Sequence, residues 1–426
     1  MRIRRKKYPY MKEVLYYATV DNGLTVTFLP KTDFKETYGI LTTEFGALHT
    51  HFKKKGQEYS YPEGIAHFLE HKLFETADED DVMNLFADLG ASANAYTSLR
   101  QTSYLFSTTE NVLECLALLQ QFVREPHFTA ENVSKEQGII GQEIEMYQDD
   151  ADYRLYTGIL SSLYPETALA HDIAGTIESI KAITAEDLYE NFEAFYHPSK
   201  MSLFVIGNFD VKKVWKQVKT FQLAQNDTEI EPIEHLPVKK LDILKNRTEY
   251  FEVASPKLAL GLRGNDSISL ANLPSYRISL QLLFAMLFGW TSQRYQTLYD
   301  QGKIDSSFHF QVEVTPDYHH VIFSADTKEP ISLSASLRKA VSRFAKDPDV
   351  SEEHLALLKK EMYGDFIRSL NSLEFTASHF VANSLVGASI FDLPQLIESI
   401  GLQDVLEVGQ AFIENCDMTD YMIFPK

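Results

Sequence analysis

The chain has 426 residues, of which 44% are apolar and 23% are charged, as expected for a globular protein with two or three domains. Its formal net charge of −20 argues against nucleic acid as a partner, because the phosphates would be repelled at long range. The two cysteines, Cys115 and Cys416, make no disulfide framework, so we expect the chain in the reducing cytoplasm.

Strand patterns recur along the first half of the chain. The basic start, residues 1–7, is followed by no apolar run and is not interpreted as a secretory signal. Alternating apolar residues around Asn22-Gly23 predict a β-hairpin from Val14 to Leu29. Further strands are expected at Tyr38–Phe45, Ala91–Ser107 and Met201–Ile206.

Helical periodicity lies between these strands. It marks Gly64–Phe74, Asp81–Leu89, Val112–Val123 and Glu131–Tyr147. A fifth helix, Leu188–Phe195, is preceded by Thr184 and Asp187, which have the spacing of a capping box.

The second half repeats the order of the first. Residues 225–237, with Asn226-Asp227-Thr228 and two prolines, are the best linker candidate. Beyond them we expect strands and helices at Tyr276–Phe288, Leu333–Phe344 and Glu352–Leu370. The most apolar stretch of the chain, Ile278–Trp290, overlaps the first of these helices and is too short to span a bilayer, so we expect no membrane partner.

A repeated tetrad supports duplication. Ile177-Glu178-Ser179-Ile180 recurs as Ile397-Glu398-Ser399-Ile400, and a helix and an apolar strand follow each copy. We therefore predict an α+β fold of two homologous domains, each a mostly antiparallel sheet covered by helices. The predicted boundaries are 1–224 for the first domain, 225–246 for the linker and 247–426 for the second domain.

The segment His67-Phe68-Leu69-Glu70-His71 carries the chemistry. Residues four apart on a helix share a face, so both imidazoles can reach one zinc ion, with Glu70 beside them. This inverted H-x-x-E-H arrangement is typical of metallopeptidases, in which zinc acidifies a water and the carboxylate takes its proton. The competing interpretation is a half-buried histidine pair that packs on the helix.

A catalytic zinc usually has three protein ligands and one open position. The helix Glu131–Tyr147 offers Glu136, Glu143 and Glu145. Glu136 and Glu143 are seven residues apart and share a face, whereas Glu145 points elsewhere. Periodicity does not choose between the first two, and acids on a helix are often only solvated.

The H-x-x-E-H segment, the strand Asn94-Ala95-Tyr96-Thr97-Ser98 and Glu136-x6-Glu143 together resemble the pitrilysin/insulinase family, the inverzincins. Within it, the chain is most similar to half-size bacterial peptidases and mitochondrial processing peptidase subunits. The resemblance covers nearly the whole chain, including Gly175–Ile180 and the duplicated domains.

The resemblance implies roles for individual residues. His67, His71 and Glu143 would bind one zinc per chain, and Glu70 would be the general base. Glu136 would orient a ligand or tune its basicity. Asn94 and Ala95 would lie on an edge strand that takes the peptide substrate as an added strand, through main-chain hydrogen bonds.

The second half departs from the family pattern. It has no H-x-x-E-H, and its equivalent helix, Leu282–Phe288, is entirely apolar. Active members carry in this half an arginine with a tyrosine seven residues later. In this chain, Tyr299 and Ser306 take those places. Arg294 and Tyr295 are adjacent in sequence and so are poor replacements. We therefore expect a heterodimer with a homologous partner that lacks H-x-x-E-H but keeps the arginine and the tyrosine.

The function that these features favour is a zinc-dependent endopeptidase acting on short or unfolded polypeptides. The first alternative is a non-catalytic assembly subunit of the same fold, and the second is a zinc hydrolase of a non-peptide substrate. Other histidines offer less. His49 and His51 would share a strand face at the surface, and the adjacent His319 and His320 would point to opposite faces.

Overall fold

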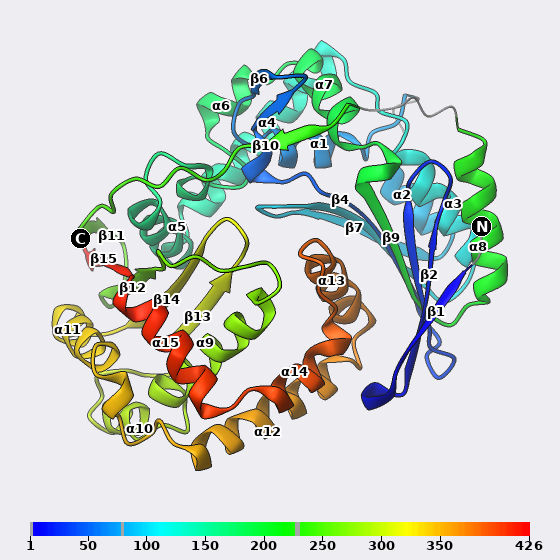
Figure 1. The fold of residues 1–426 in the computed structure, drawn as a ribbon. Coiled ribbons are helices and arrows are strands. Elements are labelled where there is room, and N and C mark those ends of the chain that lie inside the picture. The colour runs from blue at the N-terminus through cyan, green and yellow to red at the C-terminus, as the bar shows by residue number, and fades with distance from the viewer. Residues whose placement is uncertain (1–2, 78–80, 226–230) are drawn as a thin grey trace. The chain divides into compact units, whose positions relative to one another are not determined.

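The computed structural model describes residues 3–77, 81–225 and 231–426 (Figure 1). Residues 1–2 of the basic start and Asn226-Asp227-Thr228 of the linker candidate therefore lie outside the described residues. The chain forms two compact units. The first unit comprises residues 1–144, 172–236 and 369–391, and the second comprises 145–171, 237–368 and 392–426.

The first unit contains a seven-stranded sheet in the order β1-β2-β3-β9-β4-β8-β7. Along that order, its strands are Arg4–Tyr8, Glu13–Thr19, Thr25–Pro30, Met201–Gly207, Thr37–Thr43, Thr102–Thr108 and Ala91–Thr97. The pair β3 and β9 is parallel, and the other pairs are antiparallel. The predicted hairpin is confirmed, with Tyr16 opposite Phe28 and Gly23 in the turn at a left-handed φ of 98°.

The single strand predicted at Ala91–Ser107 is wrong. The segment forms two strands, β7 and β8, which pair in antiparallel fashion around the turn 98–101. In that turn the N–H of Ser98 donates to the carbonyl of Gln101 at 2.8 Å, and the Ser98 hydroxyl accepts from the Gln101 N–H. A serine side chain can hold a turn without the glycine or proline that usually reveals one.

Helices cover both faces of this sheet. The helices of the first unit are α1 Ile65–Lys72, α2 Val82–Asp88, α3 Val112–Phe122, α4 Ala130–Gln148, α6 Ile177–Ala182, α7 Ala185–Phe195, α8 Val211–Leu223 and α13 Leu373–Ser384. Only the part of α4 up to residue 144 belongs to this unit. Successive residues of a strand face opposite sides. Accordingly, Leu203 and Val205 of β9 pack into the core with α1 and α3, whereas Phe204 stacks on Phe380 of α13. A small sheet, β5 His51–Lys54, β6 Gln57–Ser60 and β10 Ile233–His235, completes the unit.

The second unit contains a five-stranded sheet in the order β11-β15-β12-β14-β13. Along that order, its strands are Arg247–Phe251, Asp417–Pro425, Lys257–Arg263, His319–Asp326 and His309–Val314. Its helices are α5 Ala151–Leu163, α9 Leu273–Phe288, α10 Gln293–Asp300, α11 Pro330–Val341, α12 Glu352–Ser369, α14 Leu393–Ser399 and α15 Leu402–Glu414. Within the described residues, no helix is both long enough and apolar enough to cross a membrane.

The two sheets share one topology. The order β3-β9-β4-β8-β7 in the first unit corresponds to β11-β15-β12-β14-β13 in the second, and in each the first pair alone is parallel. The fold is therefore α+β with two homologous units, as the sequence predicts. The division at 1–224, 225–246 and 247–426 remains a prediction. The compact units do not follow it strictly, because residues 145–171 belong to the second unit and residues 369–391 belong to the first.

Candidate metal centre

The helix α1 begins at a close contact between two backbone segments. Gly64 precedes it with a left-handed φ of 87°, and a Cβ at Gly64 would lie 2.3 Å from the carbonyl oxygen of Ala174. Next to this contact, the Ser179 hydroxyl donates to the carbonyl of Glu63 at 2.9 Å. Ala174 and the segment Gly175–Ile180 therefore pack directly against the residues that precede α1. This contact is a physical reason why the segment accompanies the motif.

The motif divides α1 into a core face and a site face. Phe68 and Leu69 are completely buried, so the prediction that they pack into the core is confirmed. His67 and His71 lie on the other face, with their ring centres 4.5 Å apart and with side chains 13% and 26% exposed. The two imidazoles are thus held side by side at the edge of the core.

The helix α4 brings a third donor to the same point. Glu143 Oε1 lies 3.8 Å from Nε2 of His67, and Glu143 Oε2 lies 3.7 Å from Nε2 of His71. One donor atom from each of the three residues lies within 4.8 Å of the others. The structure thus places Glu143, the acid that the resemblance indicated, with the histidines, whereas Glu145 is exposed on another side of α4.

The donor set suits zinc. Two nitrogens and one carboxylate oxygen are ligands that zinc accepts, and two ligand atoms on a tetrahedral zinc are about 3.4 Å apart. The separations of 3.7 and 3.8 Å need only small side-chain adjustments to reach that value. Burial and the neighbouring His71 lower the pKa of His67 to about 3, so its imidazole is neutral and able to bind a metal.

Glu136 contacts His71 rather than joining the cluster of three donors. Its Oε1 accepts a hydrogen bond from Nδ1 of His71 at 3.1 Å, which leaves Nε2 of His71 facing Glu143. Burial opposes the charged form of Glu136, but His71 and Lys72 outweigh it and lower the pKa of this carboxyl. Burial likewise opposes the charge on His71, but Glu136, Glu70 and Glu143 together raise its pKa. A carboxylate on the outer nitrogen of a histidine is a common support for metal ligation.

Glu70 is the remaining acid of the motif. The residue is 8% exposed, and Oε2 accepts a hydrogen bond from the hydroxyl of Thr97. Burial raises the pKa of Glu70 against the opposing effects of Thr97 and His71. A carboxylate with a raised pKa and a fixed orientation beside a metal is suited to accept a proton from water.

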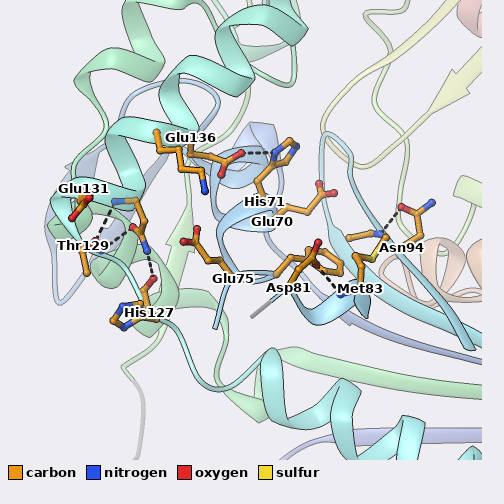
Figure 2. A pocket seen from close by; sticks show the side chains of 14 residues that line it. Glu70, His71, Glu75, Asp81, Met83, Asn94, His127, Thr129, Glu131 and Glu136 are labelled. Atoms are coloured by element: carbon orange, nitrogen blue, oxygen red, sulfur yellow. Dashed lines mark hydrogen bonds and ion pairs between the residues drawn. The ribbon is translucent and has the colours of Figure 1, made fainter. Parts of the chain in front are cut away.

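An open cavity of about 760 Å³ adjoins the motif (Figure 2). Glu70 and His71 contribute to its wall, as do Asn94 and Ala95 of β7. Among the described strands, β7 lies at the edge of its sheet and pairs on one side with β8. The main-chain N–H of Ala95 donates to the side-chain oxygen of Asn94 at 2.9 Å. Hydrogen-bonded pairs alternate along an antiparallel ladder from the bonded pair Ser98 and Gln101, so Ala95 falls in a pair that exchanges no hydrogen bond with β8.

Two residues beside the motif escaped the sequence reasoning. Thr97, which orients Glu70, lies in the Asn94–Ser98 strand that carries the resemblance, but nothing in the sequence indicates its contact with Glu70. Lys72 is completely buried and contacts Glu136, and its signal was a charged residue adjacent to the motif with apolar Leu73 and Phe74 after it. The surface location expected for His49 is wrong. It lies in the 3₁₀ helix Ala47–His49, 5% exposed, and its Nδ1 accepts from the N–H of Gly46.

An H-x-x-E-H helix, a carboxylate from a second helix and a sheet edge beside them form the arrangement typical of metallopeptidases of the inverted-motif class. Two family models match the chain: "Insulinase (Peptidase family M16)" at residues 56–177, and "Peptidase M16 inactive domain" at residues 182–362. The uncharacterized zinc protease YmfH of Bacillus subtilis (strain 168) is 39% identical over 100% of both chains. The chain therefore belongs to the pitrilysin/insulinase-type family M16 of zinc peptidases, as a half-size member.

Solved structures agree with this assignment. An M16-like peptidase from Alicyclobacillus acidocaldarius superposes with a TM-score of 0.92 and 30% identity, over 100% of this chain and 99% of the other. The periplasmic protease PqqL from Escherichia coli shares the fold, with a TM-score of 0.72 and 21% identity. That match covers 96% of this chain and 47% of PqqL, so the fold of this chain corresponds to about half of the longer protein.

Proposed function

We propose that this chain is a zinc-dependent endopeptidase that cleaves short or unfolded polypeptides, with one zinc per chain. The observation that carries the proposal is the convergence of donor atoms from His67, His71 and Glu143 within 4.8 Å, next to the buried carboxylate of Glu70. A scaffold has no need of a complete donor set with a supporting carboxylate behind it.

Each side chain has a separate task. His67, His71 and Glu143 hold the metal, and Glu136 keeps the ring of His71 in its binding orientation. Zinc in such a site makes a bound water acidic enough to ionise near neutral pH and polarises a carbonyl. Glu70 accepts the proton of the attacking water at its carboxylate, which the Thr97 hydroxyl holds in place.

The substrate is an extended peptide that adds to the edge of β7. The Ala95 N–H donates to the neighbouring Asn94 side chain, and a substrate carbonyl can replace that oxygen. Binding through the main chain reads an extended backbone more than side chains, so folded proteins are poor substrates.

The second half of the chain suggests a partner. Tyr299 is 51% exposed on α10, and Arg294 is tied to Asp347 in an ion pair, so Arg294 is already engaged elsewhere. Neither residue replaces the arginine and tyrosine that active family members carry. We propose that the active form is a heterodimer with a homologous chain that keeps this pair and lacks H-x-x-E-H. Oriented donors at a developing oxyanion contribute about 3–4 kcal/mol, so the chain alone should be weakly active.

The alternative is a non-catalytic assembly subunit. The match of residues 182–362 to the "Peptidase M16 inactive domain" is the observation that supports this alternative. The complete donor set of the first unit favours catalysis.

A cytoplasmic location is also proposed, on the basis of the two cysteines, and it would place the substrate among intracellular peptides.

The deciding experiment is metal analysis of the purified chain together with a quenched-peptide assay, with and without a chelator. One zinc per chain, with chelator-sensitive hydrolysis of unfolded peptides, is the expected result. His67→Ala should lose the metal. The absence of zinc after reconstitution, or chelator-resistant hydrolysis, would overturn the proposed chemistry.

The heterodimer is tested separately by size exclusion and by assays with and without candidate partner chains. The expected result is feeble activity alone and strong activity with the partner. A robustly active monomer or homodimer would refute this part while leaving the zinc site intact.

A further inference from the structure

Lys72 is an unusual residue to find at the end of α1. It follows His71 directly, and its side chain is completely buried. Lysine is almost never fully buried unless it is paired. Two carboxylates pair with it: that of Glu75, three residues further on, and Oε2 of Glu136 at 3.6 Å.

A buried ion pair is weak evidence for a contribution to stability. Removing charges from water costs several kcal/mol for each ion, and replacing a whole buried ion pair by well-packed apolar groups of similar volume is often neutral or stabilising. The neighbours Phe68, Leu69 and Leu73 are apolar and buried, so an apolar side chain would also suit the position. The ion pair therefore calls for an explanation in the chemistry of the site.

The geometry of Glu136 supplies that explanation. Its two carboxylate oxygens have different partners, since Oε1 accepts from Nδ1 of His71 at 3.1 Å and Oε2 faces the ammonium of Lys72 at 3.6 Å. The torsion at the end of a glutamate side chain is broad, so a single contact would leave the carboxylate free to turn. Contacts on both oxygens hold its plane in one orientation.

We propose that Lys72 is a positioning residue of the metal centre, which acts by holding Glu136 against the outer nitrogen of His71. The row Glu75, Lys72, Glu136 and His71 then keeps Nε2 of His71 directed at Glu143. Glu75, with its side chain 26% exposed, anchors the row at its solvent end. This inference rests on the zinc site proposed above.

The test compares zinc affinities, measured by competition with a chromophoric chelator, so that it needs no substrate. Lys72→Met keeps the length and apolar stem of the side chain and removes the charge. It should weaken zinc binding about 10-fold, as expected for loss of an outer partner of a ligand. The melting temperature of the metal-free protein should fall, because the change leaves the buried carboxylate of Glu136 without its cation. Lys135→Met, the same change at an exposed residue next to Glu136, is the matched control and should leave the affinity unchanged.

A double-mutant cycle separates positioning from a general effect of charge. If Lys72 acts through Glu136, then Lys72→Met should change the affinity less than about twofold in a Glu136→Gln background. An undiminished loss in that background, or an unchanged affinity in the single variant, would overturn the proposal.

Glu75→Gln tests the row from its solvent end, where folding is not at risk. It should weaken zinc binding by a smaller factor, about 2- to 5-fold. If Lys72→Met does not fold, this arm decides, and an unchanged affinity of Glu75→Gln would refute the inference. Failure of the wild-type chain to bind zinc would instead refute the proposed function.

Discussion

Replacing Glu70 with glutamine separates the chemical step from metal binding. The amide keeps the size of the side chain and an oxygen that can accept from the Thr97 hydroxyl. It removes only the ability to take a proton from water. His67, His71 and Glu143 are unchanged, so zinc should stay at one per chain.

The expected loss follows from the role of a general base, which contributes about 10²- to 10⁴-fold to the rate. At about 1.4 kcal/mol for each factor of ten, the barrier rises by roughly 3–5 kcal/mol. The stability of the variant, in contrast to its activity, should not fall. Burial raises the pKa of Glu70, so folding at neutral pH works against its charge. The metal-free variant should therefore melt no lower than the wild type at neutral pH. Any advantage should shrink as the pH falls through the raised pKa of Glu70, and it should be gone below the ordinary carboxylate pKa.

The assay measures kcat/KM on a quenched unfolded peptide, with zinc content and melting temperature on the same samples. Glu145→Gln is the matched control, since it makes the same change at an exposed position of α4 and should keep activity within about twofold. Full activity of Glu70→Gln would show that another group is the base. Loss of zinc would show that Glu70 is a ligand.

Three other changes test the parts that hold the site. Gly64→Ala puts a Cβ at a φ of 87° and 2.3 Å from backbone. It should destabilise the protein by at least about 1 kcal/mol and weaken zinc binding; an unchanged melting temperature would contradict the close contact. Ala95→Pro removes the N–H that a substrate strand would use, so KM should rise while zinc content stays; an unchanged KM would argue against edge binding. Asp266→Asn acts in the second unit, where burial would raise the pKa of Asp266 but hydrogen bonds from His319 and Tyr276 hold it below its ordinary value. This stabilisation is present at neutral pH and lost as the pH falls through the lowered pKa. Asp266→Asn should therefore melt below the wild type at neutral pH, and the difference between their melting temperatures should close in acid.

Local rules account for what the sequence predicts correctly. The spacing of His67 and His71 places them on one face of a helix wherever that helix packs, because helical geometry depends only on neighbouring residues. The hairpin around Gly23 and the cap formed by Thr184 and Asp187 are likewise local, and both are present.

Distant contacts decided the rest. Glu136 and Glu143 share a face of α4, so the sequence pattern cannot say which one reaches the histidines without the family resemblance. The choice depends on where along α4 the helix α1 lies, and the structure places Glu143 at the Nε2 atoms and Glu136 at the outer nitrogen of His71. That crossing point is a property of packing between elements, not of either helix.

The same reason explains the largest surprises in the fold. The helices α5 and α13 pack with units other than those of the adjoining sequence. Their placement could not be predicted, because periodicity shows that a helix face is apolar but not which sheet it will cover. Lys72 can be buried because it pairs with two carboxylates from different parts of the fold. Neither ion pair can be predicted from the order of residues in the sequence. Local geometry determined the motif, and tertiary packing determined its partners, because burial and pairing arise only when distant segments come together.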